Sequence, residues 1–177
     1  MTTLTMPFTA TAAKPGFDIG PVARTLVTIA CFTMCFFVAI ALGRAALGLV
    51  DGLHHYAKLP VIIHVASVLP AIPLGGFLLL ARKGTKLHKQ LGKLWLVLML
   101  ITATSAIFIQ SSGGFSFIHI FVPITFHAAW KTIATARKGD IAGHKKHLVF
   151  TYLTALMIPG IVAFAIPGRL MNTMLMG

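Results

Sequence analysis

Five apolar runs follow one another along this chain, each close to the ~20 residues that a helix needs to cross the ~30 Å hydrocarbon core of a bilayer. They cover about residues 25–50, 60–81, 88–109, 115–136 and 147–166. Only helices and closed barrels satisfy every backbone polar group in lipid. The runs lack the strict alternation of apolar and polar residues that barrel strands require. The sequence therefore predicts an all-α, polytopic transmembrane bundle of about five helices.

Composition supports this fold class. Hydrophobic residues make up 57% of the 177 residues and charged residues only 10%, whereas soluble domains carry charge on about a quarter of their residues. Residues 1–22 are polar and Thr-rich, and they do not have the basic start and short apolar core of a signal peptide. We therefore predict a disordered tail over 1–22 and a single transmembrane helical domain over 23–177. Residues 60–166 would form its four-helix core.

The net charge of +12 is distributed as a topology signal. Basic residues of short loops favour the cytoplasmic side of a membrane. In a five-helix arrangement twelve of the fifteen basic residues lie on one side, and the other side has only Arg44, Lys58 and Arg169. This pattern predicts a cytoplasmic N-terminus and a C-terminus outside. It also argues against nucleic-acid binding, which needs a continuous solvated basic face.

Six of the eight histidines can be placed by depth. His64 in the second run and His119 in the fourth each lie about a turn from the outer end. His88 in the third run, and His144 or His147 in the fifth, lie at the cytoplasmic edge. His127 lies near the middle of the fourth run. The remaining pair, His54 and His55, is expected in an outer loop, with adjacent side chains pointing apart.

Histidines from two facing helices suit a haem, because each helix can supply one neutral imidazole to the iron. We therefore predict that His64 and His119 ligate an outer haem b and that His88 and His144 ligate an inner one, with His147 and His127 as alternates. Arg169, near the outer surface, could pair with a haem propionate. This histidine order and sidedness resemble the four-helix di-haem core of the cytochrome b561 group, in arrangement only.

Other readings of the same residues stay open. His64 and His119 could instead form hydrogen bonds across helices, or hold a copper or zinc ion, although no Met or Cys motif stands beside them. Cys31 and Cys35 are expected to pack as small apolar side chains. Pro70 and Pro73, with two glycines close behind, should kink the second helix. Trp95 and Trp130 lie where interfacial belt residues are usual.

Two loop motifs carry a resemblance to a bacterial membrane family catalogued as domain of unknown function 2306. They are His-Lys-Gln-Leu-Gly-Lys-Leu-Trp at 88–95 and Arg-Lys-Gly-Asp-Ile-Ala-Gly-His-Lys-Lys at 137–146. Phe-Ser-Phe-Ile-His at 115–119 and Ile-Pro-Gly-Arg at 166–169 add to the likeness. The resemblance covers most of residues 60–177 and implies a multi-pass protein of the bacterial inner (cytoplasmic) membrane. It assigns no activity.

Three functions follow as hypotheses. The first is a b-type haem protein, with one or two haems, that transfers electrons within or across the bilayer and exchanges them with a quinone or a redox partner protein. The second is a non-enzymatic accessory or assembly subunit of a larger membrane complex. The third is proton or metal-ion conduction along His64, His119 and His127. No motif for a hydrolase or a transferase is present.

Overall fold

The computed structural model describes residues 19–81, 83–110, 114 and 116–177, and these residues are helical with short connections. Five helical stretches are long and apolar enough to cross a membrane, as predicted. The first three spans are single helices, α1 (Pro21–Ala46), α2 (Leu59–Leu80) and α3 (Lys86–Ile107). The fourth span joins the short helix η2 (Phe117–Ile120) to α4 (Phe121–Arg137). The fifth joins α5 (Ile141–Phe150), the π-helix η3 (Thr151–Met157) and α6 (Ile158–Ala165).

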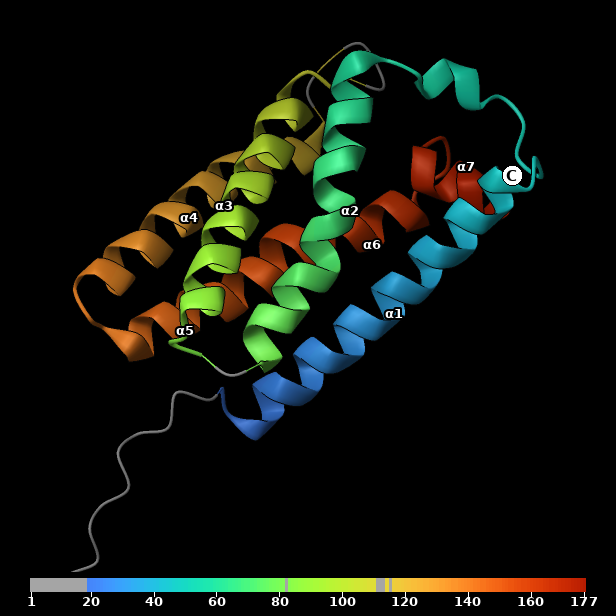
Figure 1. The fold of residues 1–177 in the computed structure, drawn as a ribbon. Coiled ribbons are helices and arrows are strands. Elements are labelled where there is room, and N and C mark those ends of the chain that lie inside the picture. Colours follow the sequence, from blue (N-terminus) through green and yellow to red (C-terminus); the bar gives the residue numbers. More distant parts are fainter. Residues whose placement is uncertain (1–18, 82, 111–113, 115) are drawn as a thin grey trace, which may run out of the picture.

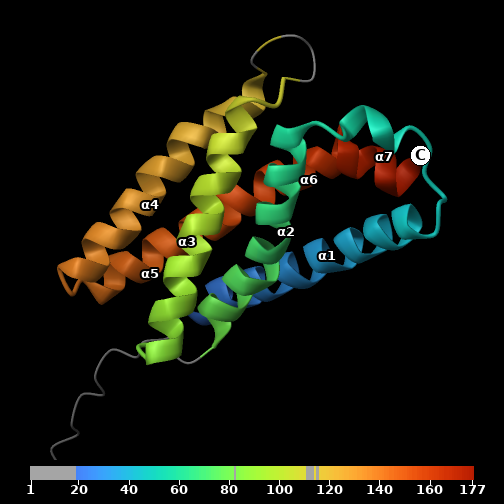
Figure 2. The ribbon, with the colours of Figure 1, turned by 45° about the horizontal axis from the view of Figure 1, so that its top comes forward.

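Two short helices complete the fold: η1 (Leu53–Tyr56) between α1 and α2, and α7 (Leu170–Met176) after the fifth span. The spans pack in chain order, α2 against α3, α3 against α4, and α4 against α5 and η3. The η3 segment also contacts α2, which closes the four-helix core (Figures 1 and 2). Helix α1 packs on the outside of this core, against α2, η3 and α7.

The first and fifth spans begin at other residues than predicted. Helix α1 begins at Pro21, inside the tail predicted over 1–22, while residues 1–18 of that tail lie outside the described residues. The fifth span begins at Ile141, well before the apolar run. Gly139 turns the chain in a left-handed conformation (φ 72°), and the Asp140 carboxylate then accepts a hydrogen bond from the Gly143 amide at 2.8 Å. This N-cap lets the helix start among charged residues.

The proline- and glycine-containing part of α2 is tightly packed against its neighbours. The helix continues through Pro70 and Pro73 and changes direction midway (Figures 1 and 2), as expected. A Cβ atom on Gly75 would lie 2.6 Å from Trp95 Nε1 and from Tyr152 Cδ2. These glycines therefore let α3 and η3 approach the α2 backbone closely.

The prediction for Trp95 is wrong. Its side chain is only 1% exposed, and its Nε1 donates a hydrogen bond to the Ala71 carbonyl at 2.9 Å. Gly75 has no side chain, and this leaves room for the indole ring of Trp95 inside the bundle. Trp95 is therefore buried and does not lie at the membrane interface. Trp130 differs, since it is exposed on α4 and the Lys131 ammonium lies 5.0 Å from its ring centroid.

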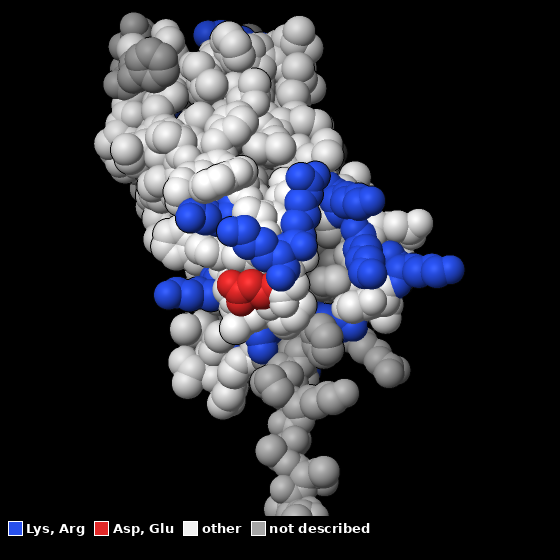
Figure 3. Space-filling view, turned by 90° about the vertical axis from the view of Figure 1, so that its left-hand side faces the viewer, with Lys and Arg blue, Asp and Glu red and all other residues white. Residues whose placement is uncertain are grey.

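The outer surface of the bundle is suited to lipid. Large apolar side chains such as Phe32, Ile62 and Val97 are more than half exposed. Lysines and arginines gather instead over one part of the face shown in Figure 3, around a single patch of acidic atoms. We call this the basic end: the junctions of α2 with α3 and of α4 with α5. It carries the loops expected in the cytoplasm, and the N-terminal orientation itself stays a prediction.

Candidate functional site

An apolar cavity of about 200 Å³ lies inside the bundle, towards the end opposite the basic end. Its walls come from α1, α2, α3, η2, α4, η3, α6 and the start of α7. Three of the five residues predicted to bind the cofactor line it, namely His64, His119 and Arg169. These residues belong to three different segments of the chain. The fold thus brings the predicted outer histidines and the predicted cation to one place.

His64 is held in position by α3. Its Nδ1 atom lies 3.0 Å from the Thr102 carbonyl oxygen and 3.2 Å from Ser105 Oγ. A carbonyl oxygen can only accept, so Nδ1 carries the proton and the neutral ring has its lone pair on Nε2. The Ser105 hydroxyl donates to the same Thr102 carbonyl at 3.0 Å. The Ser67 and Thr102 hydroxyls pair at 2.8 Å, and the Ser67 hydroxyl lies 2.9 Å from the His64 carbonyl oxygen.

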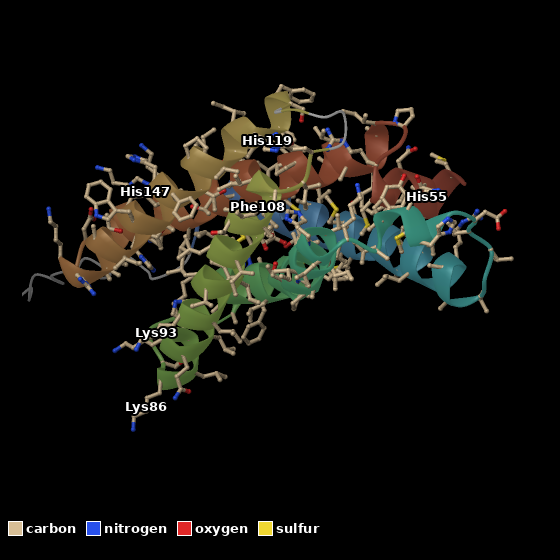
Figure 4. All side chains as sticks on the ribbon, turned by 90° about the horizontal axis from the view of Figure 1, so that it is seen from above. His55, Lys86, Lys93, Phe108, His119 and His147 are labelled. Carbon is tan, nitrogen blue, oxygen red and sulfur yellow. The ribbon has the colours of Figure 1, made fainter. Side chains whose placement is uncertain are left out.

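His119 is held by its own helical turn. Its Nδ1 atom lies 3.1 Å from the Ser116 amide nitrogen and 3.0 Å from the Ser116 carbonyl oxygen, while its Nε2 is fully buried. Figure 4 shows His119 just before the start of α4, beside the fifth span in this view. Arg169 reaches the same residue, because its guanidinium donates to Ser116 Oγ at 3.4 Å. Ser116 thus contacts both His119 and Arg169.

His88 of α3 and His144 of α5 both lie at the basic end, near enough for their charges to interact. His144 Nδ1 lies 3.0 Å from the Thr132 carbonyl oxygen, so Nδ1 carries a proton. The Thr132 side chain is 1% exposed, and its hydroxyl has no hydrogen-bond partner in the part of the chain that the structure describes. Both histidines are half-buried, although they lie among lysines. The structure therefore places both residues of the predicted inner pair at the basic end.

The other histidines lie elsewhere. His127 is exposed on α4, with its ring centroid 5.9 Å from that of Trp130, and it does not line the cavity. His147 follows one turn after His144 on α5, near the basic end (Figure 4). The rings of His54 and His55 lie 3.9 Å apart instead of pointing apart, because the tight η1 turn brings them together. His55 Nδ1 also lies 3.0 Å from the Gly52 carbonyl oxygen.

The sequence analysis missed several residues of the cavity region. Ser67, Thr102 and Ser105 are buried and surround His64. Hydroxyl side chains inside apolar runs could have pointed to them, since such residues form hydrogen bonds between membrane helices. Three methionines also line the cavity, Met34, Met99 and Met171. They come from α1, α3 and α7, so no local sequence motif identifies them as a group.

The five spans define a polytopic membrane protein, and two histidines line its apolar cavity. A family model described as "Predicted membrane protein (DUF2306)" matches residues 61–173. The chain belongs to this family, which the loop motifs had indicated. No curated protein and no solved structure matches the chain.

Proposed function

We propose that this membrane protein binds b-type haem and transfers electrons within or across the bilayer. One observation carries the proposal: His64, His119 and Arg169 come from three separate segments and line one apolar cavity. Bundle proteins build cofactor sites in this way, from inward side chains on facing helices. Ionisable side chains inside membrane spans are costly, and they usually mark functional sites.

The donor set fits an axial haem site. Histidines that bind metal usually donate their second ring N–H to a carbonyl or a carboxylate, which fixes the tautomer and the ring orientation. His64 has this arrangement with Thr102. At His119 the Ser116 amide donates to Nδ1, so ligation through Nε2 would need the other tautomer, in which Nδ1–H donates to the Ser116 carbonyl. A haem needs only two such ligands from the protein. Among the described residues no group of three His, Cys, Asp or Glu side chains forms a conventional metal site.

The walls of the cavity suit a flat ligand. Small residues line it on α3 and on α6, including Ala103, Ala106, Gly160 and Ala163. The cavity volume of about 200 Å³ lies below the ~300–1,000 Å³ of most ligand pockets. Binding of a haem therefore requires side chains of the cavity wall to repack, and unbranched methionines such as Met34 and Met171 can do so.

Arg169 supplies the positive charge of the site. A guanidinium forms strong, paired hydrogen bonds with carboxylates such as haem propionates. Its contact with Ser116 places it beside the turn that holds His119. We infer that this residue orients the cofactor, and that His88 and His144 form a second, inner site. Bound haem would supply a one-electron Fe(III)/Fe(II) couple, which histidine and arginine side chains lack.

The test is haem content and optical spectrum across a panel of purified variants. His64→Ala and His119→Ala should each remove the low-spin b-type bands of the outer site. The matched control is His127→Ala, which removes an exposed histidine from α4 and should leave the spectrum unchanged. Equal spectra in all three variants, with all three folded, would exclude haem ligation at this cavity.

A copper(I) site is the second candidate, because three methionines share the cavity with the two histidines. Thioether and imidazole ligands together select soft, reduced copper. Metal analysis of the purified protein distinguishes the two candidates. About one copper per chain without haem supports copper, and haem iron without copper supports the haem proposal.

A further inference from the structure

A second hollow lies on the lipid-facing side of the bundle, between α2 and α3. This groove measures about 420 Å³, and it is lined by Leu59, Pro60, Ile63, Val97, Leu100, Ile101, Thr104, Ser105 and Phe108. Its rims are exposed on the outer surface, with Leu59 at 69% and Phe108 at 66%. A ligand could therefore enter from the membrane without passing through water.

Ser105 joins this groove to the cavity. The residue lines the groove, yet its side chain is only 6% exposed and its Oγ lies 3.2 Å from His64 Nδ1. The hydroxyl donates to the Thr102 carbonyl, and Thr102 itself lines the cavity. A hydroxyl oxygen has two lone pairs, so Ser105 Oγ can accept from His64 and also from a ligand O–H.

We propose that this groove binds the head group of a lipid-soluble hydroquinone, with a hydroquinone O–H donating to Ser105 Oγ. The apolar walls suit the ring and an isoprenoid tail, and Ser105 supplies a polar anchor at the head-group position. An acyl chain has no group that would use this hydroxyl. The inference rests on the proposed function, because an electron carrier in the membrane can exchange electrons with a quinone, and it names the site of that quinone.

The test is photolabelling of the full-length protein in lipid nanodiscs with an azido-substituted benzoquinone, mapped by mass spectrometry. We expect the label on groove residues of α2 and α3, and we expect competition by decyl-benzohydroquinone. Ile101→Trp fills the groove and should reduce labelling at least tenfold. The matched control, Ile62→Trp, adds the same bulk to an exposed position of α2 outside the groove and should not change it.

Ser105 can be tested separately. Ser105→Ala should weaken competition by the hydroquinone about tenfold, and Ser105→Thr should restore it. Labelling that phospholipid displaces equally well, or that Ile101→Trp leaves unchanged, would show a site for acyl chains and overturn the inference. Labelling needs no haem, so it is read independently of the haem spectrum. If the protein contains haem but the groove is not labelled, only this inference is overturned. If the groove is labelled but the protein contains no haem, only the proposed function is overturned.

Discussion

The Nδ1 atom of His64 lies 3.0 Å from the carbonyl oxygen of Thr102, so α3 orients an imidazole that belongs to α2. The same relationship recurs at the basic end, where the Thr132 carbonyl on α4 orients His144 of α5. In both cases a backbone carbonyl oxygen of a neighbouring span accepts from Nδ1 and so fixes which ring nitrogen carries the proton. His64 and His144 lie at opposite ends of the bundle, and a backbone carbonyl of another helix orients each imidazole.

The close approach of α3 and η3 to α2 predicts a sharp effect at Gly75. Gly75→Ala places a methyl group 2.6 Å from Trp95 Nε1 and Tyr152 Cδ2, both on buried rings. Because overpacking forces side chains or backbone to shift, we expect a loss of about 1–3 kcal/mol in stability. Thermal unfolding in detergent measures it. Gly92→Ala is the control, since its Cβ would meet nothing within 4 Å, and equal stability of the two variants would contradict the packing described.

The start of the fifth span depends on Asp140. Asp140→Ala removes the acceptor for the Gly143 amide, so α5 should lose its N-cap at a cost of about 0.5–2 kcal/mol. Asp140→Asn keeps an acceptor oxygen and should retain most of the stability. Hydrogen exchange of residues 141–146 reports the fraying directly. Unchanged exchange in Asp140→Ala would mean that tertiary packing alone holds this helix start.

The contact between Arg44 and the C-terminal helix predicts how α7 is anchored. The Arg44 guanidinium donates to the Met174 carbonyl at 3.2 Å and to the Gly177 carbonyl, at the negative end of the helix dipole. Arg44→Ala should therefore speed hydrogen exchange over 170–176 while the rest of the bundle stays protected. Arg24→Ala, at the other end of α1, serves as the control. Equal exchange in both variants would show that α7 does not depend on Arg44.

The distribution of basic residues predicts the orientation in the membrane. Lys138 and Asp51 are exposed at opposite ends of the bundle. With Cys31 and Cys35 replaced by Ala, Lys138→Cys should react with an impermeant maleimide only after the membrane is opened. Asp51→Cys should react in intact cells. The reverse pattern would place the N-terminus outside.

Much of the fold could be predicted from the sequence, because apolar length and loop charge act locally. The spans and the depths of His64 and His119 follow from such counting. Helix α7 and the early start of α5 could not be found this way, since they depend on caps and on docking to other helices. Apolar length also gave no sign that the fifth span contains a π-helix, which precedes Pro159 and its missing N–H.

The candidate site was predictable only in part. The five ligand candidates stood out because histidine and arginine are rare inside membranes. Their orienting partners did not, because the Thr102, Ser116 and Thr132 carbonyls are backbone groups that any residue would supply. The burial of Trp95 was missed for a related reason. It depends on an absent side chain at Gly75 in a different helix.

The haem content of the purified wild-type protein tests the central claim most directly. The protein should be expressed with ample haem, purified in mild detergent, and its haem quantified per chain beside a reduced-minus-oxidised spectrum. The account predicts one or two b-type haems per chain with sharp low-spin bands. A correctly folded protein that is colourless would contradict it.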